Sequence, residues 1–201
     1  MPNRASSTGL GHERSEPGIG MSEVPPAISI GRRVVVSGVA GAGKSTFSRA
    51  LSATTGLPVI HLDVHYWKPG WVDPTHDEWR ETQCRLLDAD EWIADGNYEA
   101  TLALRLERAD TAVFLDTPRW KCAWRAFVRG IRPRPPGFEL PDGCDESAWR
   151  RLTAEWRLVG RIWRVHRSER ERELDIMSGH ASDVSLFILR SKRDIRRLLG
   201  A

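Results

Sequence analysis

Nine consecutive residues carry the clearest chemistry in this sequence. The segment Gly38-Val39-Ala40-Gly41-Ala42-Gly43-Lys44-Ser45-Thr46 fits the phosphate-binding pattern G-x-x-x-x-G-K-[ST] without a mismatch. Its glycines let backbone N–H groups curl around a phosphate chain at the positive end of a helix dipole. Lys44 would reach the β- and γ-phosphates, and the Ser45 hydroxyl would bind Mg²⁺. The pattern predicts a nucleoside triphosphate site made by Gly38, Ala40, Gly41, Ala42, Gly43, Lys44, Ser45 and Thr46.

The residues on either side of this loop have the types expected of a strand and a helix. The segment Arg33-Val34-Val35-Val36-Ser37 is rich in β-branched residues, and residues 46–51 are compatible with a helix. A strand that leads into the glycines and a helix that leads out of them is the context that the pattern requires. The alternative, a glycine-rich turn that binds nothing, is disfavoured by this combination of spacing and flanks.

Length, charge and cysteine content restrict the class of protein. The 201 residues are enough for one domain with a sizeable core. Charged residues make up 28%, the net charge is +3 and the pI is near 9.0, which suits phosphorylated ligands without being diagnostic of nucleic acid. No apolar run approaches the ~20 residues of a membrane span. Three cysteines without C-x-x-C spacing predict reduced thiols in a cytoplasmic protein.

Residues 1–29 differ from the rest of the chain in composition. They are rich in Gly, Ser, Pro and charge, show no periodicity and lack the apolar segment of a secretory signal. We expect a disordered N-terminal tail, most of which would be absent if Met21 is the start. A single phosphate-binding domain is expected over residues 30–201.

Four more short apolar runs alternate with helical stretches, at residues 57–63, 91–94, 111–116 and 184–189. This alternation predicts an α/β, three-layer P-loop NTPase fold, with a five-stranded parallel sheet and helices on both faces. Ligands bind at the carboxyl ends of such strands. Asp63, Asp95 and Asp116 each follow a run, so we expect these carboxylates and the P-loop (residues 38–46) to share one edge of the sheet.

Several of the connecting helices have recognisable caps. Thr75-x-x-Glu78 is a capping box, Gly56 is a C-cap, Thr117-Pro118 is an N-cap followed by a first helical residue, and Ser191 is an N-cap. The expected helices span about 46–55, 75–87, 101–108, 118–130, 147–165, 169–177 and 192–199.

The stretch from Ile131 to Cys144 interrupts this regular pattern. It holds four prolines and two glycines together with Arg132 and Arg134. Loops of this length are usually functional, and we expect a short lid over about 131–146. The helix predicted after it has an apolar face and a basic face. These comprise Trp149, Leu152, Trp156, Val159 and Trp163 on one side, and Arg150, Arg151, Arg157, Arg161 and Arg164 on the other.

The layout resembles P-loop kinases of the adenylate kinase and shikimate kinase type over about residues 33–199. More narrowly, it is similar to the bacterial proteins labelled DNA topology modulation protein or adenylate kinase-related. The segments that carry the narrower resemblance are His61-Leu62-Asp63, Trp67-x-Pro69-Gly70-Trp71, Asp95-Gly96-Asn97-Tyr98, Leu115-Asp116-x-Pro118-Arg119-Trp120 and Leu140-Pro141-x-Gly143-Cys144.

The resemblance implies roles for four further residues. Asp95 would hold Mg²⁺ through water, and Asp63 would orient or deprotonate an acceptor hydroxyl. Arg125 and Arg129, one helical turn apart, would clamp the phosphates, or they are a solvated basic face. The chain has Asn97-Tyr98 where adenylate kinases continue towards an AMP-binding arginine, which argues against AMP as the acceptor.

Three functions are compatible with these features. The first is a cytoplasmic kinase that uses ATP and Mg²⁺ to phosphorylate a nucleotide, nucleoside or other metabolite. The second is a nucleic-acid-associated ATPase that modulates DNA topology, favoured by the basic pI and the arginine-rich helix. The third, a GTPase-like switch, rests only on Ser191-Lys192-Arg193-Asp194, which is better interpreted as the start of a helix.

Overall fold

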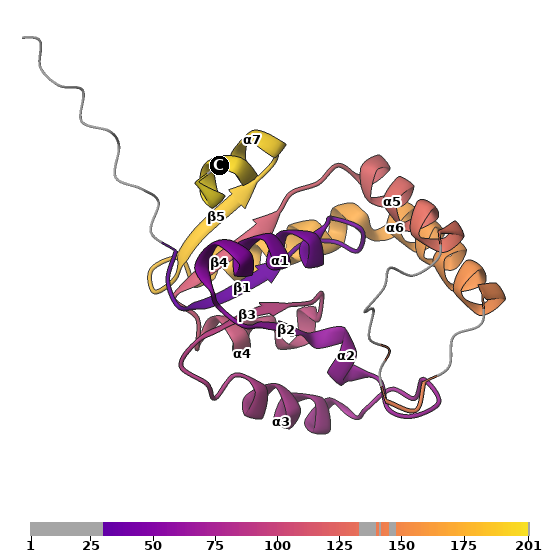
Figure 1. Ribbon diagram of the computed structural model, residues 1–201, viewed down its shortest axis with the longest axis horizontal. Helices are drawn as coiled ribbons and strands as arrows, with labels where there is room; N and C mark the ends of the chain where they lie inside the picture. Colours follow the sequence, from indigo (N-terminus) through magenta and orange to yellow (C-terminus); the bar gives the residue numbers. More distant parts are fainter. Residues whose placement is uncertain (1–29, 133–139, 141, 145–147, 201) are drawn as a thin grey trace, which may run out of the picture.

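A computed structural model describes residues 30–132, 140, 142–144 and 148–200. Five strands alternate with seven α-helices and one short 3₁₀ turn in this part of the chain (Figure 1). In chain order these are β1 (Arg33–Ser37), α1 (Lys44–Thr55), β2 (Val59–His61), α2 (Leu62–Tyr66), α3 (His76–Leu86), β3 (Trp92–Asp95), the 3₁₀ turn (Glu99–Thr101), α4 (Leu102–Leu106), β4 (Thr111–Leu115), α5 (Arg119–Ile131), α6 (Ala148–Gly179), β5 (Ser185–Leu189) and α7 (Lys192–Leu199).

The strands form one parallel sheet in the order β2-β3-β1-β4-β5. The central strand is β1, whose three valines are fully buried, as expected of a strand covered on both faces. Val36 lies opposite Asp95 on β3 and opposite Val113 on β4. The P-loop therefore leaves the middle of the sheet between the carboxyl ends of β3 and β4.

Helices cover both faces of the sheet, so the predicted three-layer α/β fold is confirmed. On one face, α1, α5 and α7 pack against alternate strand residues, with Phe47, Leu51 and Ala126 among the buried side chains. On the other face, α4 packs through Leu102 and Leu106. The long helix α6 contributes to both layers, because Ile162 belongs to the first cluster and its Met177 to the second.

The prediction of two helices over 147–165 and 169–177 was wrong, because α6 is one continuous helix from Ala148 to Gly179. Ser147 itself lies outside the described residues. The intervening residues include no proline or glycine, and the Ser168 hydroxyl donates to the Val165 carbonyl oxygen (3.0 Å) instead of capping a new helix. An ion pair between Arg167 and Glu171 then links successive turns across the supposed break.

Two other local predictions need correction. Strand β2 ends at His61, two residues before Asp63, which instead lies in the first turn of α2. Leu62 is fully buried there, so its side chain anchors α2 on the sheet and leaves Asp63 exposed. Pro118, not Thr117, is the N-cap of α5. The helix predicted over about 101–108 is present as α4, which follows the 3₁₀ turn and ends at Leu106.

The expected tail and most of the expected lid lie outside the described residues. Residues 1–29 are not described, and of the lid only residues 131–132, 140 and 142–144 are. Both therefore stay predictions. Among the helices of the described ranges, none is long and apolar enough to cross a membrane.

Candidate functional site

Glycines give the P-loop backbone dihedral angles that would be strained in other residues. Gly38, Gly41 and Gly43 all have positive φ angles, at 140°, 81° and 102°. A Cβ atom on Gly41 would lie 2.4 Å from the carbonyl oxygen of Cys122 in α5, so the loop and the start of this helix are in close contact. The loop is thus a preshaped turn that ends at the N-terminus of α1, where backbone N–H groups lack helical partners.

Two cationic side chains lie on the P-loop. Lys44 donates from Nζ to the carbonyl oxygen of Gly38 at 2.7 Å, which folds its side chain back over the loop. Arg125 donates from Nη1 to the carbonyl oxygen of Ala42 at 2.6 Å. A Cβ atom on Gly43 would meet the same Nη1 at 3.0 Å, so Arg125 closes one side of the cradle. The structure thus brings predicted residues from α1 and α5 together at the loop.

The buried carboxylate of Glu173 binds the residues that begin the P-loop. Oε2 of Glu173 accepts from the Ser37 hydroxyl (2.6 Å) and from the Gly38 N–H (3.1 Å). Glu173 is 1% exposed, and its Oε1 has no hydrogen-bond partner. Burial raises the pKa of this carboxyl, while the Ser37 hydrogen bond and the positive charge of Lys44 oppose the rise. Sequence reasoning missed Glu173, because no motif marks a glutamate in the middle of a long charged helix.

The predicted magnesium residues lie on neighbouring elements. Asp95 ends β3 and is almost fully buried, and its Oδ2 is 2.9 Å from Nδ1 of His61. Ser45 and Thr46 lie exposed in the first turn of α1. The described residues contain no cluster of three or more His, Cys, Asp and Glu side chains that would hold a metal ion unaided. This donor set suits Mg²⁺, which is usually bound by few protein ligands plus phosphate oxygens and water.

Asp63 is held by a tyrosine and, through it, by a buried arginine. The Tyr98 hydroxyl donates to Oδ1 of Asp63 at 2.8 Å. Arg105 is fully buried and donates to the carbonyl oxygens of Gly96 (3.0 Å) and Tyr98 (2.7 Å). Burial lowers the pKa of Arg105 to about 10, and the negative charge of Glu173 counteracts this. Arg105 therefore fixes the loop that places the Tyr98 hydroxyl on Asp63.

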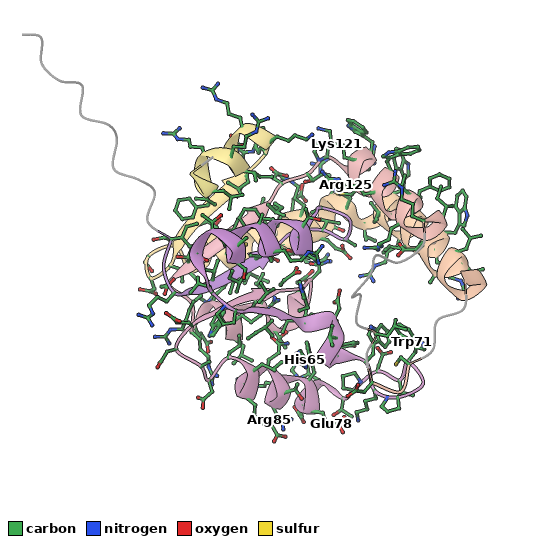
Figure 2. The ribbon with its side chains drawn as sticks, in the orientation of Figure 1. His65, Trp71, Glu78, Arg85, Lys121 and Arg125 are labelled. Carbon is green, nitrogen blue, oxygen red and sulfur yellow. The ribbon has the colours of Figure 1, made fainter. Side chains whose placement is uncertain are left out.

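Aromatic rings continue from this tyrosine along one side of the site. Tyr98 packs at 4.6 Å from Tyr66 and at 4.8 Å from Trp79, measured between ring centroids. Tyr66 meets Trp67 edge to face at 5.1 Å, and Trp67 meets Trp71 at 5.6 Å. In Figure 2, His65 and Trp71 lie on the side of the view opposite Lys121 and Arg125. The site thus has a basic, glycine-rich half and an aromatic half.

A cavity of about 490 Å³ adjoins the aromatic half. Its lining comes from the segment that follows Asp63 and from the segment around residue 142, which are far apart in the sequence. The lining residues are Val64, His65, Trp67, Pro69, Leu140 and Asp142. A volume of this size is within the range of small-molecule sites, roughly 300–1,000 Å³.

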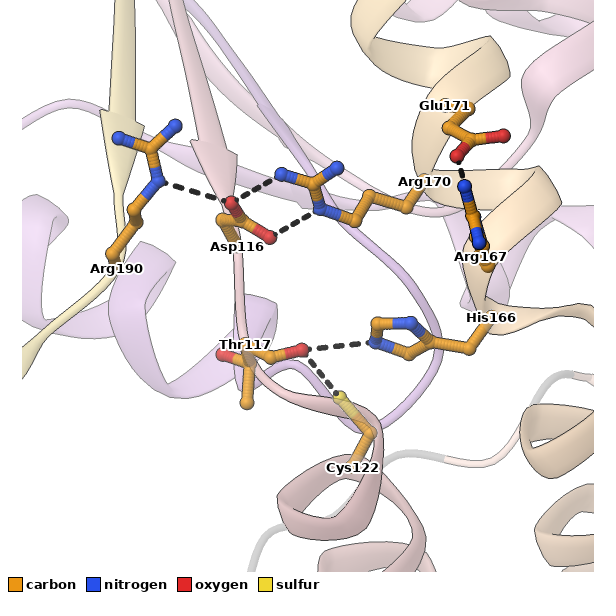
Figure 3. Close-up of polar contacts among 8 residues, drawn as sticks. All are labelled: Asp116, Thr117, Cys122, His166, Arg167, Arg170, Glu171 and Arg190. Carbon is orange, nitrogen blue, oxygen red and sulfur yellow. Dashed lines mark hydrogen bonds and ion pairs between the residues drawn. The ribbon is translucent and has the colours of Figure 1, made fainter.

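Arg129 and Asp116 engage partners outside the P-loop. Arg129 forms a two-pronged ion pair with Glu155 of α6, at 2.5 and 2.8 Å. Asp116 pairs with Arg170 of α6 at 2.6 and 2.7 Å and with Arg190 at 3.2 Å (Figure 3). The Arg170 hydrogen bonds hold the pKa of Asp116 below its ordinary value. These pairs tie α5, β4 and β5 to α6, and the phosphate role of Arg129 stays a prediction.

Three cap predictions are confirmed, among them Gly56 as the C-cap of α1, and one of the three bears on function. The capping box at Thr75 and Glu78 is complete. Ser191 and Asp194 form a second complete capping box at the start of α7, with Oγ of Ser191 accepting from the Asp194 N–H at 3.1 Å. Ser191 and Asp194, the first and last residues of the segment considered for a GTPase-like switch, therefore use their side chains to start a helix.

Comparison with known proteins finds structural likeness alone. No protein-family model matches the chain, and no curated protein matches it. Among solved structures, it is similar to a gluconokinase from Sinorhizobium meliloti 1021, with 17% identity over 84% of this chain and 90% of that one, and a TM-score of 0.48. A shikimate kinase from Bacteroides thetaiotaomicron has 15% identity over 84% and 94%, with a TM-score of 0.47. A deoxyadenosine kinase from M. mycoides has 12% identity over 84% and 95%, with a TM-score of 0.47. Likeness at this level leaves the activity to be inferred from the residues of this chain.

Proposed function

We propose that this chain is an ATP-dependent phosphotransferase that passes the γ-phosphoryl group to a hydroxyl of a small molecule. One observation carries the proposal. A complete P-loop with Lys44 and Ser45 lies at the same sheet edge as two carboxylates of different surroundings, buried Asp95 and exposed Asp63. Asp95 would serve the metal and phosphate side, and Asp63 would orient or deprotonate an acceptor hydroxyl.

The P-loop residues fit a triphosphate. Positive φ angles at three glycines give the loop the tight turn that a phosphate cradle requires, and Arg125 closes the cradle beside Gly43. Lys44 has its ammonium group on the Gly38 carbonyl oxygen, from which it can move onto a phosphate oxygen without a change of backbone. The Ser45 hydroxyl and, through water, Asp95 would hold Mg²⁺, which supplies charge neutralisation for the phosphates when bound.

Asp63 has the position and freedom of a general base. Its carboxylate is exposed and receives a single described hydrogen bond, from Tyr98, at one oxygen. The other oxygen is then available to a substrate hydroxyl. Arg125 lies on the phosphate side, where a planar guanidinium can bind the charge that spreads over the transferred group. The two roles divide between the two halves of the site.

The test is a screen of ATP consumption against nucleosides, nucleotides and sugars, with the phosphorylated product identified by mass spectrometry. Lys44→Ala is the matched control, because it keeps the fold and removes the phosphate-binding ammonium group. We expect Lys44-dependent transfer to at least one acceptor. ATP consumption that yields only free phosphate with every acceptor would contradict a transferase.

A second candidate, a nucleic-acid-associated ATPase, is favoured by the surface of α5 and α6. Four tryptophans there are 54–61% exposed, namely Trp120, Trp124, Trp156 and Trp163. Arg119 lies over the Trp163 ring at 4.4 Å, and α5 contains no acidic residue. Exposed rings among cations are a platform on which single-stranded bases stack. A salt-dependent gel shift that is lost in Trp120→Ala/Trp124→Ala would favour this candidate, and no shift would exclude it.

A further inference from the structure

The cavity next to Asp63 is a built structure. Its two walls are joined by a hydrogen bond from the Gly70 N–H to the Gly143 carbonyl oxygen at 3.0 Å. Gly143 has a φ of 68°, and a Cβ atom there would lie 2.8 Å from the Cβ atom of Pro69. The Cys144 thiol donates to the Lys68 carbonyl oxygen at 3.3 Å. Figure 1 shows the short segment at residues 142–144 lying against the stretch that follows α2. The cavity shape therefore follows from close packing of the two segments.

The cavity adjoins the acceptor side of the site. Val64 and His65 line it and directly follow Asp63 in α2. Trp67 lines it as well, and this ring is connected through Tyr66 to Tyr98, whose hydroxyl donates to Asp63. A molecule in the cavity would thus lie beside the helix that carries Asp63, with the Trp67 ring in its wall.

The charge of the lining is negative or neutral. Asp142 is its one carboxylate, and none of the described lining residues is a lysine or an arginine. Burial and the neighbouring His61 lower the pKa of His65, so this imidazole is neutral at physiological pH. Lys68 lies between two lining residues, but its ammonium group pairs with Glu78 at 2.7 Å. The described wall thus offers no free cation to a phosphate group.

We propose that this cavity binds the phosphoryl acceptor as an uncharged ring compound with free hydroxyls, of the nucleoside or cyclic sugar class, and not as a phosphate monoester. The inference rests on the proposed phosphotransferase function. Val64, Trp67, Pro69 and Leu140 supply apolar walls for a ring, while Asp142 accepts hydrogen bonds from hydroxyls. A phosphate dianion in the same place would face the Asp142 carboxylate, and no cation of the described lining would offset the repulsion.

The reaction assigned to this pocket balances without any further reactant. The acceptor hydroxyl oxygen forms a bond to the γ-phosphorus, and the bond from that phosphorus to the β–γ bridging oxygen breaks. The hydroxyl proton passes to Asp63, and the products are ADP and a phosphate monoester. The product carries the charge that the acceptor lacked, so repulsion from Asp142 favours its release.

The experiment measures binding separately from transfer. Isothermal titration compares matched pairs, such as adenosine with AMP, cytidine with CMP and glucose with glucose 6-phosphate. A saturating non-hydrolysable ATP analogue fills the P-loop, so that none of the titrated nucleosides or nucleotides can bind there. We expect at least one uncharged member to bind about tenfold or more tightly than its phosphate ester. Equal or tighter binding of every ester, or no binding by any member of the pairs, overturns the proposal.

Reversing the charge of Asp142 tests whether this residue causes the preference for uncharged ligands. Asp142→Lys is expected to shift the preference towards the phosphate ester by about tenfold or more, and Asp142→Asn by less. Asp77→Lys makes the same charge change on a fully exposed side chain of α3 and should leave the preference unchanged. An unaltered preference in Asp142→Lys overturns the assignment. If uncharged ligands bind but no transfer occurs, the pocket assignment stands and the phosphotransferase function fails.

Discussion

The two halves of the site are built by different means. The basic, glycine-rich half is the proposed nucleotide half, and the aromatic half is the proposed acceptor half. The nucleotide half consists mostly of backbone, since three glycines of positive φ and their neighbours fit within nine consecutive residues. The acceptor half consists of side chains from α2, from the turn after β3 and from the segment at 140–144. Local sequence determines the first half, whereas only the tertiary fold assembles the second.

This difference has a consequence for function. The backbone half is expected to bind the phosphates that all nucleoside triphosphates share, and a Cβ atom on Gly38 or Gly41 would collide with a backbone carbonyl oxygen. The side-chain half contains the exposed Asp63, the aromatic rings and Asp142, all of which can change without a change in the backbone. We therefore expect specificity for the proposed acceptor to depend on residues 63–71, Leu140 and Asp142, and substitutions in the two halves should affect different measurements.

The largest expected effect separates the two carboxylates. Asp63→Asn should reduce transfer by about 10²–10⁴-fold, the usual loss when a general base is removed. Affinity for an ATP analogue and slow background hydrolysis should remain, because Asp63 belongs to the acceptor half. Steady-state transfer, hydrolysis and analogue titration measure the three quantities.

Two matched variants sharpen this result. Asp95→Asn should weaken Mg²⁺-dependent turnover with every acceptor, including water. Tyr98→Phe removes only the hydrogen bond to the Asp63 carboxylate and should lower transfer by about 10- to 10²-fold, the range of one hydrogen bond to a charged group. A loss of nucleotide affinity in Asp63→Asn would mean that the two carboxylates share or exchange their roles.

Lys44→Ala tests the nucleotide half. It removes the ammonium group expected to stabilise charge on the transferred phosphoryl group, and turnover should fall by about 10²–10³-fold, as for other preorganised donors. Circular dichroism should be unchanged, because Lys44 loses a single part-buried hydrogen bond, to the Gly38 carbonyl oxygen. Turnover at the wild-type rate would show that Lys44 does not contact the reacting phosphate.

The sequence was most informative where structure depends on neighbours in the chain. The turn and helix start at the P-loop, the capping box at Thr75 and the C-cap at Gly56 are each specified by residues within a few positions, and all three are present in the structure. Nucleotide binding by the loop stays a prediction. The five parallel strands followed from alternation of short apolar runs with helices. Their order did not, because pairing depends on contacts between distant residues.

Errors and omissions arose where long-range contacts decide the outcome. The length of α6 depends on packing against both layers of the core, a feature that a helical pattern in a short window does not contain. Glu173 and Arg105 resemble ordinary charged helix residues in the sequence, yet both are buried beneath the site. Arg129 pairs with Glu155 of α6, a contact that its spacing does not reveal, and its phosphate role stays a prediction. Ion-pair partners far apart in the sequence leave no local signal.

Glu173→Ala should have a smaller but measurable effect on both the stability of the fold and the binding of nucleotide. It leaves the Ser37 hydroxyl and the Gly38 N–H buried without an acceptor, at a cost of about 1–3 kcal/mol for each group. Both the free energy of unfolding and the affinity for an ATP analogue should fall. Glu169→Ala, one turn away on α6, removes a carboxylate paired with Arg161 and should reduce stability without lowering nucleotide affinity. Equal effects of the two variants on affinity would contradict a specific role for Glu173.

The smallest effect is a pH dependence that Glu173→Gln should remove. Burial raises the pKa of Glu173, and the charged groups that act on it are Lys44, Arg105 and Glu169. Above the ordinary glutamate pKa of about 4.3, the unfolded chain loses this proton while the folded protein keeps it. The unfolded state then binds fewer protons, so wild-type stability falls with rising pH until the folded pKa is passed, by about 1.4 kcal/mol per pH unit at most.

Urea unfolding at several pH values measures this effect as the difference in stability between Glu173→Gln and the wild type. The difference should move in favour of the variant as the pH rises from about 4.3 and then level off. Asp116→Asn is the opposite control. Arg170 lowers the pKa of Asp116, so its contribution to stability is complete above the unfolded pKa of about 3.9 and is lost only on acidification. Between pH 5 and 8 its difference should be flat, because neither state of Asp116 titrates there. A flat difference for Glu173→Gln as well would mean that Glu173 titrates normally and that the support beneath the P-loop is an ordinary ionised carboxylate.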